Sequence, residues 1–231
     1  MYLLARRQWK AVGWTAGMGI VLLSASLLDT GWAPYAHFLE HLPGLLGGEA
    51  FPAFRNPHAM AINLSIPGLV FKLGLFGVPG MSFPAAKLLG WVYTFLALAA
   101  IVILARRPFG EEERPMVWLS ILILATLRSP FLPQAYGPLP GLWMLTLVAA
   151  WGHPHPAARR LGPILAAWLA LNIYWPQDFA GSPPVVALVN GIPQALLVAL
   201  GALPLIMTPR AGRSREFGPG RPAPATIMES S

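Results

Sequence analysis

The chain has 231 residues, of which 55% are hydrophobic and only 11% are charged, and its mean hydropathy is +0.57. A soluble domain carries about 25% charged residues, so a chain of this composition could not hide its apolar surface from water, and the sequence predicts an all-α membrane protein. The net charge of +7 does not indicate a nucleic-acid partner, because the 16 Lys and Arg residues form short clusters between apolar runs rather than one basic face.

The apolar runs predict about six transmembrane helices. In chain order they cover residues 11–28, 85–104, 116–127, a segment after the proline-rich hairpin 128–140 that ends near Trp151, 161–175 and 185–207. A cleaved signal peptide is the alternative for the first run. That run is about 18 residues long, longer than a usual signal core, and it has no clear cleavage site before Asp29.

A long loop, residues 29–82, separates the first two predicted spans. Its stretch 62–78 is apolar but contains Pro67, three glycines and Lys72, which favours a re-entrant or interfacial helix over a full span. From residue 209 to 231 the chain is rich in Arg, Gly, Pro and Ser. We therefore expect a transmembrane domain over residues 1–208 and a disordered tail over 209–231.

The basic residues predict the orientation. With the N-terminus in the cytoplasm, twelve of the sixteen Lys and Arg residues lie inside, and only Arg55, Lys72, Lys87 and Arg128 lie outside. We therefore expect both termini in the cytoplasm, the loop 29–82 on the outer face, and a multi-pass protein of the inner (cytoplasmic) membrane.

No motif for catalysis or for a cofactor stands out. His37, Glu40 and His41 have the H-x-x-E-H spacing of some zinc peptidases. However, Pro43-Gly44 follows at once and no separate motif offers a third ligand. A polar face on an interfacial segment is the favoured interpretation, and we expect no metal and no cofactor.

Polar residues on the outer side are the candidate binding groups. Asn63 and Ser65 sit in the re-entrant stretch, and Gln134 and Tyr136 lie where the third predicted span turns into the fourth. Polar groups at membrane depth are costly unless they pair or face a cavity. The outer carboxylates are Asp29, Glu40, Glu49 and Asp178, and any one of them is more commonly a solvated loop residue than a catalyst.

Three blocks carry a resemblance to a known family. They are the basic first helix followed by Gly31-Trp32-Ala33-Pro34-Tyr35 and Leu42-Pro43, the segment Asn63-Leu64-Ser65-Ile66-Pro67-Gly68-Leu69, and Ser129-Pro130 with Tyr136 leading into an apolar helix. In this order they resemble the C-terminal half of the bacterial polyprenyl-phosphate-dependent glycosyltransferases, glycosyltransferase family 87 in the GT-C class.

The resemblance implies a lipid-linked sugar donor at the outer face of the membrane. Enzymes of the GT-C class typically use an acidic residue of the first outer loop as catalytic base, because the acceptor hydroxyl must lose a proton as it attacks. That loop belongs to the half that the resemblance does not cover. In the third block, Pro133 and Ala135 stand where the family often has an aromatic and a polar residue. The resemblance therefore leaves the catalytic residue unknown and implies a second membrane protein that carries the N-terminal catalytic half.

The sequence therefore predicts a membrane glycosyltransferase-like module that binds a lipid-linked donor or acceptor. Lys72 and Arg128 offer positive charge to a phosphate, although interfacial snorkelling also explains such residues. The alternatives are a noncatalytic scaffold subunit and a small-solute transporter. The transporter is disfavoured because the predicted spans hold almost no charged residue. The candidate substrate-binding residues are Lys72, Arg128, Asn63, Ser65, Gln134 and Tyr136.

Overall fold

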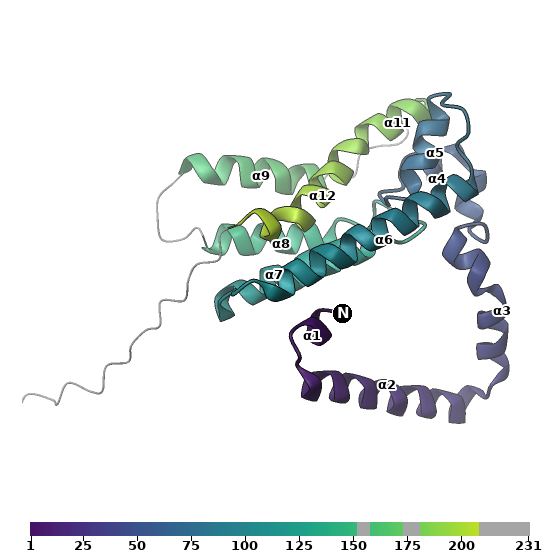
Figure 1. The fold of residues 1–231 in the computed structure, drawn as a ribbon. Helices are drawn as coiled ribbons and strands as arrows, with labels where there is room; N and C mark the ends of the chain where they lie inside the picture. The colour runs from purple at the N-terminus through teal and green to yellow at the C-terminus, as the bar shows by residue number, and fades with distance from the viewer. Residues whose placement is uncertain (152–157, 173–180, 208–231) are drawn as a thin grey trace, which may run out of the picture.

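A computed structural model describes residues 1–151, 158–172 and 181–207, and within them it contains helices and no strand (Figure 1). The all-α prediction is confirmed. The helices are α1 (Tyr2–Ala5), α2 (Trp9–Thr30), α3 (Ala33–Gly47), η1 (Pro52–Arg55), α4 (Pro57–Ala61), α5 (Gly68–Leu75), α6 (Phe83–Arg106), η2 (Glu111–Glu113), α7 (Arg114–Thr126), α8 (Leu139–Trp151), α9 (Ala158–Asn172), α11 (Pro183–Val189) and α12 (Gly191–Ile206).

Every apolar run that was predicted as a span coincides with a helix. By length and composition, α2, α6 and the continuous pair α11–α12 can each cross a membrane. The other three are shorter, with 13, 13 and 15 residues in α7, α8 and α9, whereas a bilayer needs about 20. The predicted tail, 209–231, lies outside the described residues.

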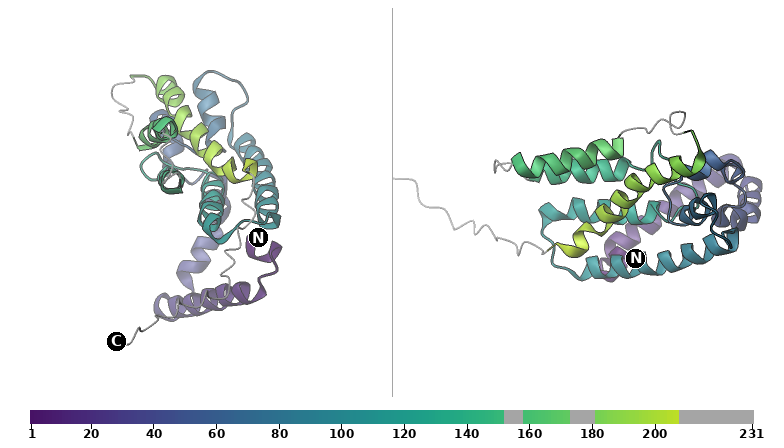
Figure 2. Two further views of the ribbon diagram at one scale, coloured as in Figure 1. Left: turned by 90° about the vertical axis from the view of Figure 1, so that its left-hand side faces the viewer. Right: turned by 90° about the horizontal axis from the view of Figure 1, so that it is seen from above.

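Helices α7, α8, α9 and α12 pack around one core, and Figure 2 shows α12 passing across α7 and α8. Met116 and Ile123 of α7, Met144 of α8 and Leu197 of α12 are almost completely buried there. Gly201 lets α12 approach closely, since a Cβ at this position would lie 3.1 Å from Leu124 Cδ2. This close packing of α12 on α7 fixes the helix from which the next loop begins.

The N-terminal helices lie largely apart from that bundle (Figures 1 and 2). The short helix α1 packs against α6, and the ring of its buried Tyr2 meets Trp118 edge-on at 4.9 Å between ring centroids. No residue of α2 is buried. Helix α3 then returns and approaches α6, and it ends at Gly47. The C-cap residue Gly48 has a φ of +87°, a conformation that favours glycine.

The stretch 62–78, which was predicted to be re-entrant or interfacial, contains the short helix α5. Helix α4 precedes this stretch, and both α4 and α5 pack against α11. Between them, residues 62–67 have no regular helix. Phe54 and Phe71 stack near Phe83 and tie this loop to the start of α6. A broken, partly buried helical segment matches the expected interruption by proline and glycine.

Candidate functional site

Residues 62–67 are held against the loop that follows α7. The amide of Leu64 donates to the carbonyl of Leu132 at 2.8 Å, and the amide of Ile66 donates to the carbonyl of Leu127 at 2.9 Å. These two bonds join segments more than sixty residues apart in the chain. They satisfy backbone groups that a helix cannot satisfy where the chain is irregular.

The side chains of Asn63 and Ser65 complete this junction, and both residues are fully buried. Asn63 Nδ2 and Ser65 Oγ each donate to the carbonyl of Pro130 at 3.0 Å. Asn63 Oδ1 accepts from the amides of Ser65 and Leu132, and Ser65 Oγ accepts from the amide of Gly68. The predicted binding residues Asn63 and Ser65 therefore hold the backbone of Pro130 in place.

Lys72 is buried on α5 and is connected to the same junction through Gln194. Its Nζ donates to Gln194 Oε1 at 2.9 Å, and Gln194 Nε2 donates to the carbonyl of Ser65 at 2.7 Å. Burial lowers the pKa of Lys72 to about 7. A buried amine of this kind holds its positive charge less readily than a solvated lysine does.

A cavity of about 600 Å³ opens where α3 approaches α6 and the loop after α7. It contains two cationic side chains and one aromatic ring in an otherwise mostly apolar wall. The lining residues are Pro43, Leu46, Gly47, Lys87, Trp91, Thr94, Ala125, Arg128, Ser129 and Pro130.

Arg128 is fixed on three sides. Its Nε donates to Thr94 Oγ1 at 2.6 Å, and its guanidinium carbon lies 6.0 Å from the centroid of the Trp91 ring. A Cβ at Gly90 would lie 3.1 Å from the guanidinium carbon, so this buried glycine makes room for the cation. A guanidinium held in this way is oriented before any ligand arrives.

Lys87 is held differently, by an exposed ion pair. Its Nζ lies 2.8 Å from Glu49 Oε1, and the two side chains are 43% and 45% exposed. Its stem crosses Gly47, where a Cβ would collide with Lys87 Cε. Exposed ion pairs contribute little to stability, so an incoming anion can replace the carboxylate at small cost.

The structure separates the remaining predicted residues. Gln134 is buried and lines a second, smaller cavity of about 100 Å³ with Asn172, while Tyr136 is 57% exposed and lines neither cavity. Lys72 and Arg128 have different hydrogen-bond partners, and only Arg128 lines the larger cavity. Of the six predicted residues, Arg128 is the one in that cavity, and Asn63 and Ser65 hold its Pro130 wall.

Sequence reasoning singled out only Arg128 of the ten cavity residues, and the missed ones include Lys87, Trp91 and Thr94. They are spaced four and three residues apart on α6, which places them on one helical face. This spacing was visible in the sequence. The sequence does not show that the guanidinium of Arg128 lies beside this face of α6.

The structure describes three of the four carboxylates that were predicted to lie on the outer side. Asp29, Glu40 and Glu49 are exposed, and Glu49 is the one paired with a cavity residue. Asp178 lies outside the described residues. The site thus presents a preoriented guanidinium, an exchangeable ammonium and an apolar wall, which together suit an anion attached to an apolar group.

Comparison with known proteins identifies a family. A family model described as Glycosyltransferase family 87 matches residues 1–133. The matched stretch contains every residue that lines the larger cavity. No curated protein and no solved structure matches the chain significantly. Because the family model covers more than half of the 231 residues, the chain belongs to glycosyltransferase family 87.

Proposed function

We propose that this membrane glycosyltransferase-like protein binds a polyprenyl-phosphate-linked sugar, with the phosphate against Arg128 in the larger cavity. The observation that carries the proposal is the fixed guanidinium of Arg128 in a mostly apolar wall. Arginine matches phosphate geometry with two parallel N–H donors and stays charged at any physiological pH. The exposed face of α6 beside the cavity carries Leu88, Val92 and Phe95, which offer an apolar surface to a lipid chain.

The other predicted residues fit this proposal as supports. Asn63 and Ser65 set the position of Pro130, and Lys72 acts on the same junction through Gln194. Lys87 would supply the second positive charge once Glu49 is displaced. Gln134 and Tyr136 lie farther along the loop and are proposed to contact the sugar or the acceptor.

Removing the ion pair between Lys87 and Glu49 is expected to strengthen the binding of polyprenyl phosphate rather than weaken it. Replacing Glu49 with glutamine removes the carboxylate that competes for Lys87, so polyprenyl phosphate should bind to the Glu49→Gln variant more tightly, by up to about fivefold. The measurement is a titration of the purified chain in nanodiscs with polyprenyl phosphate, followed by tryptophan fluorescence. Asp29→Gln, at an exposed carboxylate on α2, serves as the matched control and should leave the affinity unchanged.

Two outcomes would contradict the proposed binding of polyprenyl phosphate in the larger cavity. One is the absence of saturable binding by the wild-type chain. The other is weaker binding by Glu49→Gln, which would mean that the carboxylate itself contacts the ligand.

We also propose a location in the bacterial inner membrane, with residues 29–82 on the outer face and both termini in the cytoplasm. The support is the distribution of basic residues, twelve against four. The chain has no cysteine, so Arg55→Cys and Glu111→Cys each introduce a single thiol at an exposed position. In intact cells an impermeant maleimide should label the Arg55→Cys variant alone. Labelling of Glu111→Cys alone would reverse the orientation.

We further propose that sugar transfer requires a second membrane protein. The support is α2, an apolar helix of 22 residues with none buried against the rest of this chain, since membrane helices associate through exposed, closely fitting faces. Purified chain in liposomes with a polyprenyl-phosphate sugar should therefore transfer none to acceptor until a partner is added. Efficient transfer by the chain alone would instead assign the catalytic base to one of its own carboxylates.

A further inference from the structure

Three potential metal ligands lie together on α3, away from the cavity. His37, Glu40 and His41 each offer one ligand atom, and these atoms all lie within 4.8 Å of one another. All three residues are exposed. In a tetrahedral zinc site with bonds of about 2.0–2.1 Å the ligand atoms stand roughly 3.3 Å apart, so modest rotations of free side chains would close the site.

The structure removes the objection that the sequence raised. Helix α3 continues through Pro43 to Gly47, so His37 and His41 stand one turn apart on a regular helix and share a face. Glu40 lies between them in the chain and offers a third ligand atom. The whole set therefore comes from a single helical turn, and no distant motif is required.

One hydrogen bond already prepares His41 for coordination. Its Nδ1 lies 2.8 Å from the carbonyl oxygen of His37. A carbonyl can only accept, so Nδ1 carries the proton, and in the neutral ring Nε2 is left with a lone pair. Histidines that bind metals commonly have this arrangement, with the other ring nitrogen donating to a backbone carbonyl.

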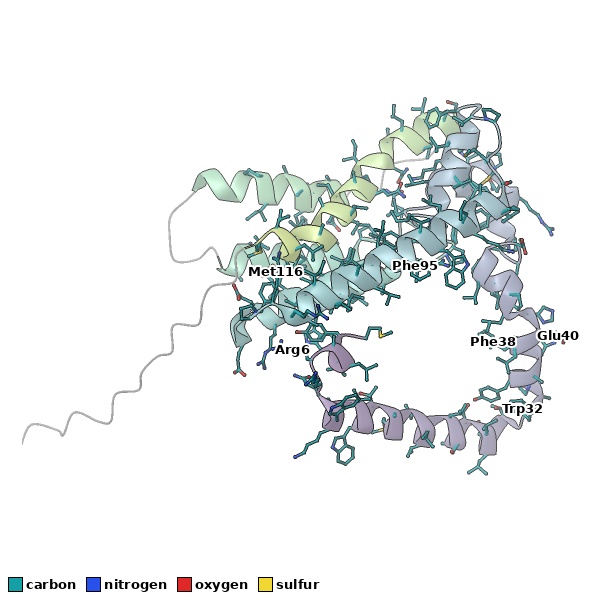
Figure 3. The ribbon with its side chains drawn as sticks, in the orientation of Figure 1. Arg6, Trp32, Phe38, Glu40, Phe95 and Met116 are labelled. Carbon is teal, nitrogen blue, oxygen red and sulfur yellow. The ribbon has the colours of Figure 1, made fainter. Side chains whose placement is uncertain are left out.

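None of the three residues lines the cavity. Figure 3 shows Phe38 on the side of α3 that faces toward α6, and Glu40 on the opposite side. A bound metal would therefore use no cavity-lining residue as a ligand. It would instead fasten the turn of α3 that precedes Pro43, Leu46 and Gly47, three residues of the cavity wall.

We infer that α3 binds one divalent transition-metal ion of the zinc class through His37, Glu40 and His41, with water in the remaining position. Two imidazoles and one carboxylate select Zn²⁺, Co²⁺, Ni²⁺ or Cu²⁺ over Mg²⁺ and Ca²⁺, which prefer oxygen ligands. A ligand set with one open position is the pattern of a three-residue zinc site. This inference is independent of the proposed function.

The test is a titration of the purified full chain with Zn²⁺ in competition with a chromogenic chelator. All measurements use a His153→Ala/His155→Ala background, because these two residues are the only histidines besides His37, His41 and His58. We expect one Zn²⁺ per chain. His37→Ala or His41→Ala should weaken binding by at least about tenfold, and Glu40→Gln by a smaller factor. His58→Ala is the matched control and should bind as the background does.

Two further readouts distinguish a site from adventitious binding. Co²⁺ should give the strong visible absorption of a four-coordinate complex in the background chain, and this absorption should be lost in His37→Ala. Zn²⁺ should also slow amide hydrogen exchange in the α3 peptide. If Zn²⁺ affinity is the same in His37→Ala, His41→Ala and the background, or if Mg²⁺ binds equally well, the inference is wrong.

Discussion

Replacing Arg128 with alanine is expected to weaken the binding of polyprenyl phosphate by at least about tenfold. A hydrogen-bonded charge pair contributes about 1.5–3 kcal/mol, and every 1.4 kcal/mol is about a factor of ten in affinity. Arg128 is already oriented by Thr94 and Trp91, so little side-chain freedom is lost when the phosphate binds. The titration in nanodiscs that tests Glu49→Gln measures this loss.

Two matched variants test whether the loss of affinity comes from the paired N–H donors of Arg128 and from its place in the cavity. Arg128→Lys keeps the charge but cannot form two parallel N–H bonds, so we expect an intermediate affinity. Lys72→Met removes an amine that does not line the cavity, so its effect should be smaller than that of Arg128→Ala. If Lys72→Met costs more than Arg128→Ala, the phosphate site lies at α5 and not at α6. Equal binding by all variants would remove the phosphate site altogether.

The helices could be predicted from the sequence because each depends on a local property. An apolar run such as that of α6 is bounded by Pro84 and Arg106, and these residues mark its ends whatever the rest of the chain does. Residues 62–78 were also predicted as an interrupted helix, since Pro67 and the glycines disfavour a continuous one. The third predicted span, residues 116–127, is as short as the 13-residue helix α7 that forms there.

The candidate site was harder to predict because it is built from distant segments. Arg128 stood out as one of few outer cations, which is a local feature. Its position beside Thr94 depends on how α6 packs against the loop after α7, and Lys87 depends on the return of α3. Asn63 and Ser65 were singled out as polar groups at membrane depth. That their partner is the carbonyl of Pro130, 67 and 65 residues away, is a tertiary fact.

The hydrogen bonds of Asn63 and Ser65 depend in turn on the absence of a side chain at Gly68. An alanine Cβ there would collide with Asn63 Nδ2 and would lie 2.6 Å from Asn63 Cγ and 2.9 Å from Ser65 Oγ. Neither side chain can retreat, because both are fully buried and hydrogen-bonded. The collision therefore has to be relieved by breaking bonds to Pro130 or by shifting α5.

Gly68→Ala is accordingly expected to destabilise the fold by about 1–3 kcal/mol through overpacking, with a further loss for each buried polar group left unpaired. Gly74→Ala is the matched control on the same helix. A Cβ there meets only Met81 Cβ at 3.4 Å and Met81 Cγ at 3.9 Å, and alanine favours the helix by up to about 1 kcal/mol. Thermal unfolding of the purified chains, followed by tryptophan fluorescence, should show a midpoint several degrees lower for Gly68→Ala and unchanged or higher for Gly74→Ala.

Because Pro130 lines the cavity, Gly68→Ala should also bind polyprenyl phosphate more weakly below its unfolding midpoint, whereas Gly74→Ala should bind normally. Equal midpoints for the two variants would mean that residues 62–67 are not held against Pro130. Asn63 and Ser65 would then not position the Pro130 wall of the cavity.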